Sequence, residues 1–172
     1  MPAEKWKAWK TEREEWLEKN PKPHTDQQKK EYYAKFPAQI EKWLDQNYGA
    51  LVLAESEPNK IVDDALHHFD GDRYVLDEYV VAANHVHALV TPFGDNGLSD
   101  ILHSWKSFTA NKINKHLGET GVFWQKESFD HAVRSPDSLE KFRVYIRAHK
   151  VEEASSLLGD ANKASSLLTD PP

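Results

Sequence analysis

Large apolar side chains recur at helical spacing among charged residues in the first part of the chain. Over residues 3–19, tryptophans lie three and seven positions apart in a helix-favouring background, and the Asn-Pro-Lys-Pro segment that follows stops the run. A second run covers residues 26–46 and is closed by Tyr48-Gly49, and we expect Pro37 to kink or interrupt it. Together the runs predict a helical hairpin over residues 1–49 with its aromatic side chains in the core.

After this hairpin, helical and extended patterns alternate. Spacing and turn residues predict a helix over 58–69, a strand over 73–81, a helix over 100–117, a strand pair or an extended segment over 121–133, and a final helix from about 135 to 153. Residues 154–172 are rich in serine and contain Ala-Ser-Ser-Leu-Leu twice. We expect this tail to be weakly ordered and assign it no function.

The apolar, β-branched segment 79–90 predicts a strand or a hairpin pinched at Ala83-Asn84, and it carries two histidines. Side chains two positions apart on a strand share one face, so His85 and His87 project together. Two neutral imidazoles on a rigid strand form half of a site for a divalent metal. The simpler alternative is that both histidines line a polar face of the sheet.

The predicted final helix supplies candidates for the other half of the site. Tyr145 and His149 lie four residues apart and therefore on one face of that helix. If the helix crosses the sheet face that carries the histidine pair, His149 completes a three-histidine site and Tyr145 lies beside the metal. A metal-bound phosphate would then be open to attack by a tyrosine oxygen, which is a weak nucleophile at its ordinary pKa near 10. Ordinary amphipathic packing remains the alternative.

Composition narrows the chemistry of such a site. The chain has 172 residues, a length typical of one domain. It contains no cysteine, so any metal must be held by histidine, carboxylate, amide or water. Apolar runs are too short to span a bilayer and the charged N-terminus is no signal sequence, so we expect a cytoplasmic protein without a membrane partner.

Charge is unevenly distributed along the chain. The formal net charge is −6, yet acidic residues dominate positions 55–78, whereas basic residues outnumber acidic ones over positions 101–150. Aromatic side chains are interleaved with the bases there. This distribution permits a nucleic-acid surface on the C-terminal half without requiring one.

Five short motifs over about residues 60–154 occur in an order that is more specific than any one of them. They are Asn84-His85-Val86-His87, Trp105-Lys106-Ser107-Phe108-Thr109-Ala110, Phe123-Trp124-Gln125, Phe129-Asp130 with Arg134, and Tyr145-Ile146. In this order they resemble the HUH-type tyrosine transposases associated with repetitive extragenic palindromes.

The resemblance implies a role for each candidate residue. His85 and His87 would bind a divalent metal, Mn²⁺ or Mg²⁺, and Tyr145 would attack single-stranded DNA to give a 5′-phosphotyrosyl link and a free 3′-hydroxyl. The third ligand falls on His149, where the family more often places an amide side chain. Because imidazole suits transition metals better than magnesium, we expect a preference for manganese or another transition metal over magnesium.

The resemblance also implies the fold. We expect an α+β domain over residues 1–153, with a ferredoxin-like antiparallel sheet, helices on one face and a catalytic core over residues 50–153. Two departures are visible: Ala82-Ala83 stands where relatives usually have Met-Pro, and the family's first core strand has no counterpart before the N-terminal helix. Either the sequence starts inside the family's domain, or the sheet is short by one strand.

The expected partner is single-stranded or hairpin DNA, bound by a monomer or a homodimer. Candidate phosphate contacts are Lys106, Arg134, Arg143 and Arg147, although a solvated basic face explains each equally well. Three alternatives remain open: a catalytically inactive descendant that binds hairpin DNA as a regulator, a metal-binding protein unrelated to nucleic acid, and simple core packing of the four candidate site residues.

Overall fold

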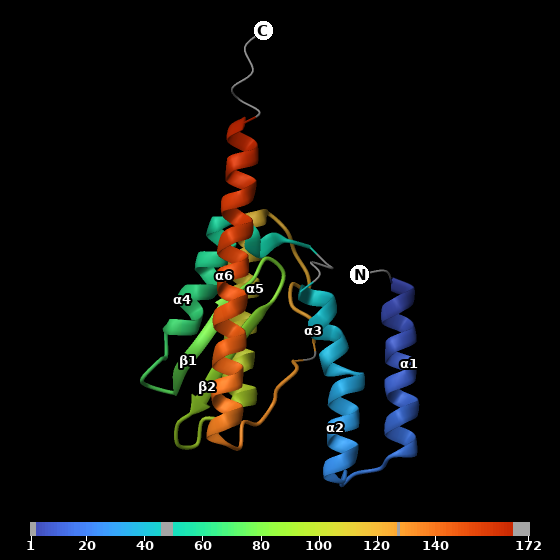
Figure 1. Ribbon diagram of the computed structural model, residues 1–172. Helices are drawn as coiled ribbons and strands as arrows, with labels where there is room; N and C mark the ends of the chain where they lie inside the picture. Colours follow the sequence, from blue (N-terminus) through green and yellow to red (C-terminus); the bar gives the residue numbers. More distant parts are fainter. Residues whose placement is uncertain (1–2, 46–49, 127, 167–172) are drawn as a thin grey trace. The chain divides into compact units, whose positions relative to one another are not determined.

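The computed structural model describes residues 3–45, 50–126 and 128–166, and it divides the chain into two compact units (Figure 1). The first unit is Met1–Ala50 and the second is Leu51–Pro172. Each unit has its own buried side chains.

The first unit is the predicted helical hairpin, built from α1 (Ala3–Lys19), α2 (Asp26–Lys35) and α3 (Pro37–Asp45). Pro37 interrupts the second run as predicted, because its ring is tolerated at the first position of α3 and not in a helix interior. Trp9, Trp16 and Phe36 are buried, and the ring of Phe36 contacts both tryptophans edge-on. The aromatic residues are therefore core. The predicted close at Tyr48-Gly49 lies outside the described residues.

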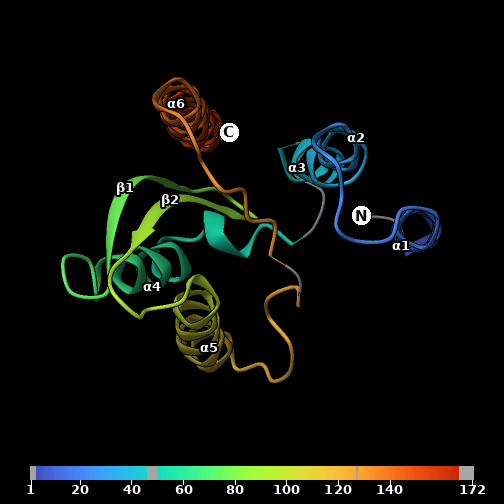
Figure 2. The ribbon, with the colours of Figure 1, turned by 90° about the horizontal axis from the view of Figure 1, so that it is seen from below.

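The second unit is a β-hairpin between two layers of helix (Figure 2). Its elements are a short 3₁₀ helix η1 (Val52–Ala54), α4 (Ser56–His67), β1 (Tyr74–Val81), β2 (Val86–Pro92), α5 (Leu98–Leu117) and α6 (Pro136–Ser166). The strands pair antiparallel, with Tyr74 opposite Pro92 and Val81 opposite Val86. Helices α4 and α5 lie on one face of the hairpin, and α6 crosses the other.

One face of the hairpin forms the apolar core with α4 and α5. Leu53, Val62, Leu66 and Ile113 are buried together, and Leu76, Tyr79, Val81 and Val86 of the strands pack against them. A buried hydrogen-bond chain ties the layers: Tyr74 Oη donates to the Leu66 carbonyl at 2.7 Å and accepts from Trp105 Nε1 at 2.9 Å. Because Val81 and Val86 belong to this packing, the core also holds the turn end of the hairpin, next to His85 and His87.

A β-bulge interrupts β1. Leu76 pairs with Val90 but Tyr79 pairs with Ala88, so two residues of β1 stand opposite one of β2. Without the bulge, Asp77 and Glu78 would point to opposite faces of the sheet. With it, both carboxylates bind arginines of α6.

The α+β class and the antiparallel sheet are confirmed, with three differences in detail. The helices were expected on one face, but α6 lies opposite α4 and α5, where it meets the charged residues of β1. Of the two alternatives for 121–133, the strand pair does not form among the described residues, and Phe123 and Trp124 pack on the core from irregular backbone. The final helix was expected to end near 153, but α6 continues to Ser166. The predicted tail's last residues, 167–172, lie outside the described residues.

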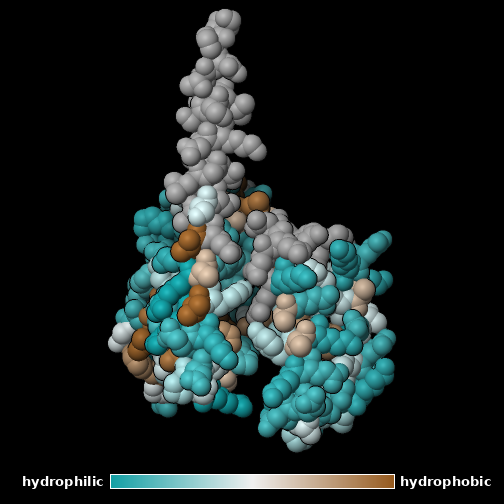
Figure 3. All heavy atoms as spheres, viewed as in Figure 1, coloured by the Kyte–Doolittle hydropathy of each residue, from teal (hydrophilic) through white to brown (hydrophobic). Residues whose placement is uncertain are grey.

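The outer side of α6 is exposed. Val144 and Val151 are 56% and 66% exposed, and the space-filling view shows separate apolar spots over this helix among hydrophilic residues (Figure 3). Over the residues that the structure describes, none of the helices combines the length and the apolar character needed to cross a bilayer.

Removing the Tyr74 hydroxyl tests how tightly the layers are joined. The Tyr74→Phe substitution leaves the Trp105 indole N–H and the Leu66 carbonyl without their buried partner, since Tyr74 is 1% exposed. We expect it to lower the free energy of unfolding by about 1–3 kcal/mol, measured by urea denaturation. The matched control is Tyr145→Phe, which removes a hydroxyl from a side chain that is 39% exposed and should cost less than about 0.5 kcal/mol. Equal effects would contradict a structural role for the Tyr74 hydroxyl.

Candidate active site

The turn of the β-hairpin fixes the two histidines predicted from the sequence. Val80 of β1 pairs with His87 of β2, and the Ala82 N–H donates to the His85 carbonyl at 2.9 Å, which closes the turn. A hydrogen bond from η1 also holds the turn: the Leu53 N–H donates to the Ala83 carbonyl at 3.0 Å. The side chains of His85 and His87 therefore leave a rigid piece of backbone on the face that α6 covers.

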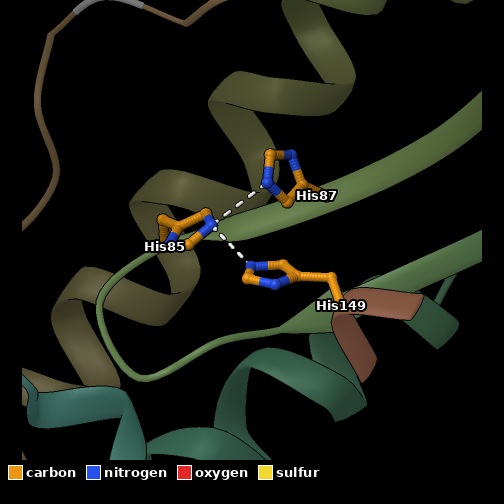
Figure 4. Close-up of side chains that lie close together, drawn as sticks. All are labelled: His85, His87 and His149. Carbon is orange, nitrogen blue, oxygen red and sulfur yellow. Dashed lines mark hydrogen bonds between the residues drawn. The ribbon is translucent and has the colours of Figure 1, made fainter. Parts of the chain in front are cut away.

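Helix α6 brings a third histidine to this pair (Figure 4). The Nε2 atom of His85 lies 3.1 Å from Nε2 of His87 and 3.2 Å from Nε2 of His149. His85 and His149 are 7% and 8% exposed, and ligand atoms of the three residues all lie within 4.8 Å of one another. Three imidazole nitrogens, two from the β-hairpin and one from α6, thus lie close enough together to bind one metal ion.

The protonation of His85 suits it to bind a metal. Its Nδ1 lies 2.6 Å from Oδ1 of Asn84, so Nδ1–H donates to that amide and Nε2 keeps its lone pair. Burial, followed by the neighbouring charges of His87 and His149, lowers the pKa of His85 from 6.5 to about 3. His85 is therefore neutral at physiological pH, as a metal ligand must be.

Tyr145 lies at the edge of the three-histidine cluster. Its Oη is 3.4 Å from Nε2 of His87, and its ring stacks against His149 one turn further along α6. The side chain is 39% exposed, in contrast to the buried His85 and His149. The phenol oxygen thus lies beside the cluster, on a side chain that is partly open to solvent.

A comparison with protein families places this site in a known context. A family model described as "Transposase IS200 like" matches residues 46–149, which is more than half of the chain and includes all four candidate site residues. The chain belongs to the IS200-like transposase family. Searches of curated proteins and of solved structures gave no match. Membership of a transposase family implies transposase-like action on DNA, and the three histidines are able to hold a metal ion.

Three of the four basic residues predicted to contact DNA in this transposase family member are engaged within the protein. Lys106 Nζ donates to the Gln125 carbonyl at 2.8 Å. Arg143 and Arg147 bind acidic residues of β1, whereas Arg134 is exposed. The structure therefore brings Tyr145 and the histidines together as predicted, but it gives two of the arginines intramolecular partners.

Sequence reasoning missed the residues that support the site. The sequence places Asn84 in the turn and in the first motif without a role of its own, although its position next to His85 is a signal that it could orient the ring. Asp77 and Glu78 were noticed only as part of an acidic segment, because neither the bulge nor the pairing with α6 is visible in the sequence.

The lowered pKa of His85 predicts a pH dependence of stability in the metal-free protein. Between the folded pKa of about 3 and the unfolded value of 6.5, the unfolded chain binds the extra proton, so stability falls as pH falls through this range. His85 contributes at most about 1.4 kcal/mol per pH unit. We expect His85→Asn to flatten the decline in unfolding free energy between about pH 7 and about pH 4.5, measured by urea denaturation in a chelator. Parallel declines in both proteins would contradict a buried, neutral His85.

Proposed function

We propose that the protein nicks and rejoins single-stranded DNA in a metal-dependent reaction with Tyr145 as the nucleophile. The observation that carries the proposal is the 3.4 Å separation between Tyr145 Oη and Nε2 of His87, within the cluster formed with His85 and His149. A nucleophile and a set of metal ligands at this distance can act on one phosphodiester. The family match supplies the general context of DNA transposition.

His85, His87 and His149 are the residues that would hold the metal. The donor set fits a divalent ion, because three Nε2 atoms converge and His85 is neutral with its lone pair directed into the cluster. When bound, such an ion offsets charge on a phosphate oxygen and eases departure of the leaving oxygen. Either Mn²⁺ or Mg²⁺ is compatible with the reaction, and three imidazoles favour Mn²⁺.

The chemical step follows from the position of Tyr145. Its phenol oxygen attacks the phosphorus, the bond from phosphorus to the 3′ oxygen breaks, and the 5′ phosphate becomes esterified to Tyr145. The phenol proton passes to solvent and the departing 3′ oxygen gains a proton to become a hydroxyl. In the joining reaction, a 3′-hydroxyl attacks the phosphotyrosine and restores the diester, so the energy of the original bond is conserved.

The proposed substrate is DNA that forms a hairpin or a palindromic end. Support comes from the ordered motifs that resemble transposases associated with repetitive extragenic palindromes. Among the four candidate phosphate contacts, Arg134 is exposed and is the arginine that is not paired with an acidic residue of β1. A hairpin-binding regulator without catalysis is the alternative outcome of the test.

A covalent adduct is the expected product of a trapped reaction. We expect the purified protein, incubated with Mn²⁺ and an end-labelled single strand that contains a hairpin, to give a protein–DNA adduct on a denaturing gel. Tyr145→Phe should abolish the adduct, because the substituted ring has no oxygen to attack phosphorus. The matched control is Tyr33→Phe, which removes a hydroxyl from α2 in the other unit and should leave the adduct intact.

Two outcomes would contradict the proposal. An adduct that persists in Tyr145→Phe would place the nucleophile elsewhere. Hairpin binding without any adduct, over a pool of hairpin sequences, would favour the non-catalytic regulator.

The identity of the third ligand predicts the metal preference. Replacing His149 with Asn exchanges an imidazole for an amide oxygen, which is a harder ligand. We expect His149→Asn to weaken Mn²⁺ binding by roughly 10-fold or more. The ratio of Mn²⁺ affinity to Mg²⁺ affinity should also fall. Calorimetric titration with each metal measures both effects. An unchanged Mn²⁺ affinity would exclude His149 from the ligand set.

A further inference from the structure

Two arginines of α6 bind neighbouring acidic residues of β1. Arg143 holds the Asp77 carboxylate at two points, with Nε at 2.9 Å and Nη2 at 2.6 Å from Oδ2, while Nε also lies 3.1 Å from Oδ1. Arg147 Nε donates to Glu78 Oε1 at 2.7 Å. A two-point contact between a guanidinium and a carboxylate fixes direction as well as distance. The pairs therefore constrain how α6 lies on the sheet.

The β-bulge makes this double contact possible. Adjacent residues of a regular strand point to opposite faces, and only one of Asp77 and Glu78 would reach α6. The change in register between Leu76 and Tyr79 places both carboxylates within reach of arginines that are one helical turn apart. The acidic side chains are only 26% and 24% exposed, which limits screening of the pairs by solvent.

The arginines and the site residues occupy opposite flanks of the side of α6 that faces the sheet. With about 3.6 residues per turn, positions 143 and 147 fall on one flank and positions 145 and 149 on the other. Ile146 lies between them and is buried. The first flank contacts β1, and the second meets the histidines at the hairpin turn and on β2. Any rotation of α6 about its axis moves both flanks together.

We propose that Asp77 and Glu78 act with Arg143 and Arg147 as a clamp that positions α6, so that these arginines are positioning residues of the site and not phosphate contacts. This inference rests on the proposed function, because the clamp positions the residues of α6 that are proposed to bind the metal and attack the DNA. It revises the sequence-based prediction of two DNA contacts. A DNA phosphate would have to compete with the Asp77 carboxylate for Nε and Nη2 of Arg143, and with Glu78 for Nε of Arg147.

Metal affinity is the first readout of the clamp. Calorimetric titration of the full chain with Mn²⁺ should show a loss of about 10-fold or more in Arg143→Gln and in Asp77→Asn, because His149 is no longer held against His85. The double variant should bind about as weakly as Arg143→Gln alone, since each single variant already removes the pair between Arg143 and Asp77. Arg143→Lys keeps the charge but not the two-point contact and serves as a milder variant if Arg143→Gln folds poorly.

Lys141 provides the matched control. It is an exposed base on the same helix, so Lys141→Gln removes the same charge as Arg143→Gln without touching the clamp. Its Mn²⁺ affinity should equal that of the unsubstituted protein.

DNA affinity separates positioning from phosphate binding. With a fluorescein-labelled hairpin oligonucleotide and a chelator present, the slope of log affinity against log salt should be the same in Arg143→Gln and in the unsubstituted protein. Loss of one phosphate contact would reduce that slope by about 0.7 in the single-stranded part of the hairpin and by about 0.9 in its duplex stem.

A third readout needs neither metal nor DNA. The rings of His87 and Tyr145 are 5.3 Å apart between centroids, so nuclear Overhauser effects between their protons report the placement of α6. These effects should persist in Lys141→Gln and weaken in Arg143→Gln. If the unsubstituted protein fails to bind Mn²⁺, the proposed metal site is wrong, but the nuclear Overhauser effects still test whether the clamp positions α6. Unchanged effects in Arg143→Gln, or a reduced salt slope in that variant, would overturn the clamp proposal.

Discussion

Helix α6 lies across the face of the hairpin that α4 and α5 leave open, and the candidate site exists only where that helix meets the hairpin turn. The hairpin contributes His85 and His87, and α6 contributes His149 and Tyr145. Among the side chains of α6 whose burial is described, the buried ones are Ile146 and His149. Ion pairs along one flank and imidazoles along the other therefore determine how the helix lies.

The chemistry of the site explains how an acidic protein can act on an anionic polymer. The three candidate ligands are imidazoles, and burial keeps His85 uncharged by lowering its pKa to about 3. A divalent ion held by neutral ligands keeps its full charge, whereas carboxylate ligands would offset it. Local attraction for a phosphate would then come from the metal rather than from the overall charge of −6. Partly exposed Tyr145 completes the site on the side that faces solvent.

Much of the site could be predicted from spacing alone. Strand alternation placed His85 beside His87, and helical spacing placed Tyr145 one turn from His149, because both depend on local backbone geometry. The side of the sheet on which α6 lies could not be predicted, since it depends on tertiary pairing with Asp77 and Glu78 across a bulge. For the same reason, Arg143 and Arg147 looked like free cations in the sequence. Phe123 and Trp124 suggested a strand, but their burial comes from packing against the core.

The most direct test of this account is a crystal structure of the protein with Mn²⁺, in which anomalous scattering locates the ion. The account predicts one manganese peak bound by the Nε2 atoms of His85, His87 and His149, with the Tyr145 hydroxyl beside it. A manganese ion bound elsewhere, or an anomalous map without a peak at these three nitrogens at saturating metal, would contradict it.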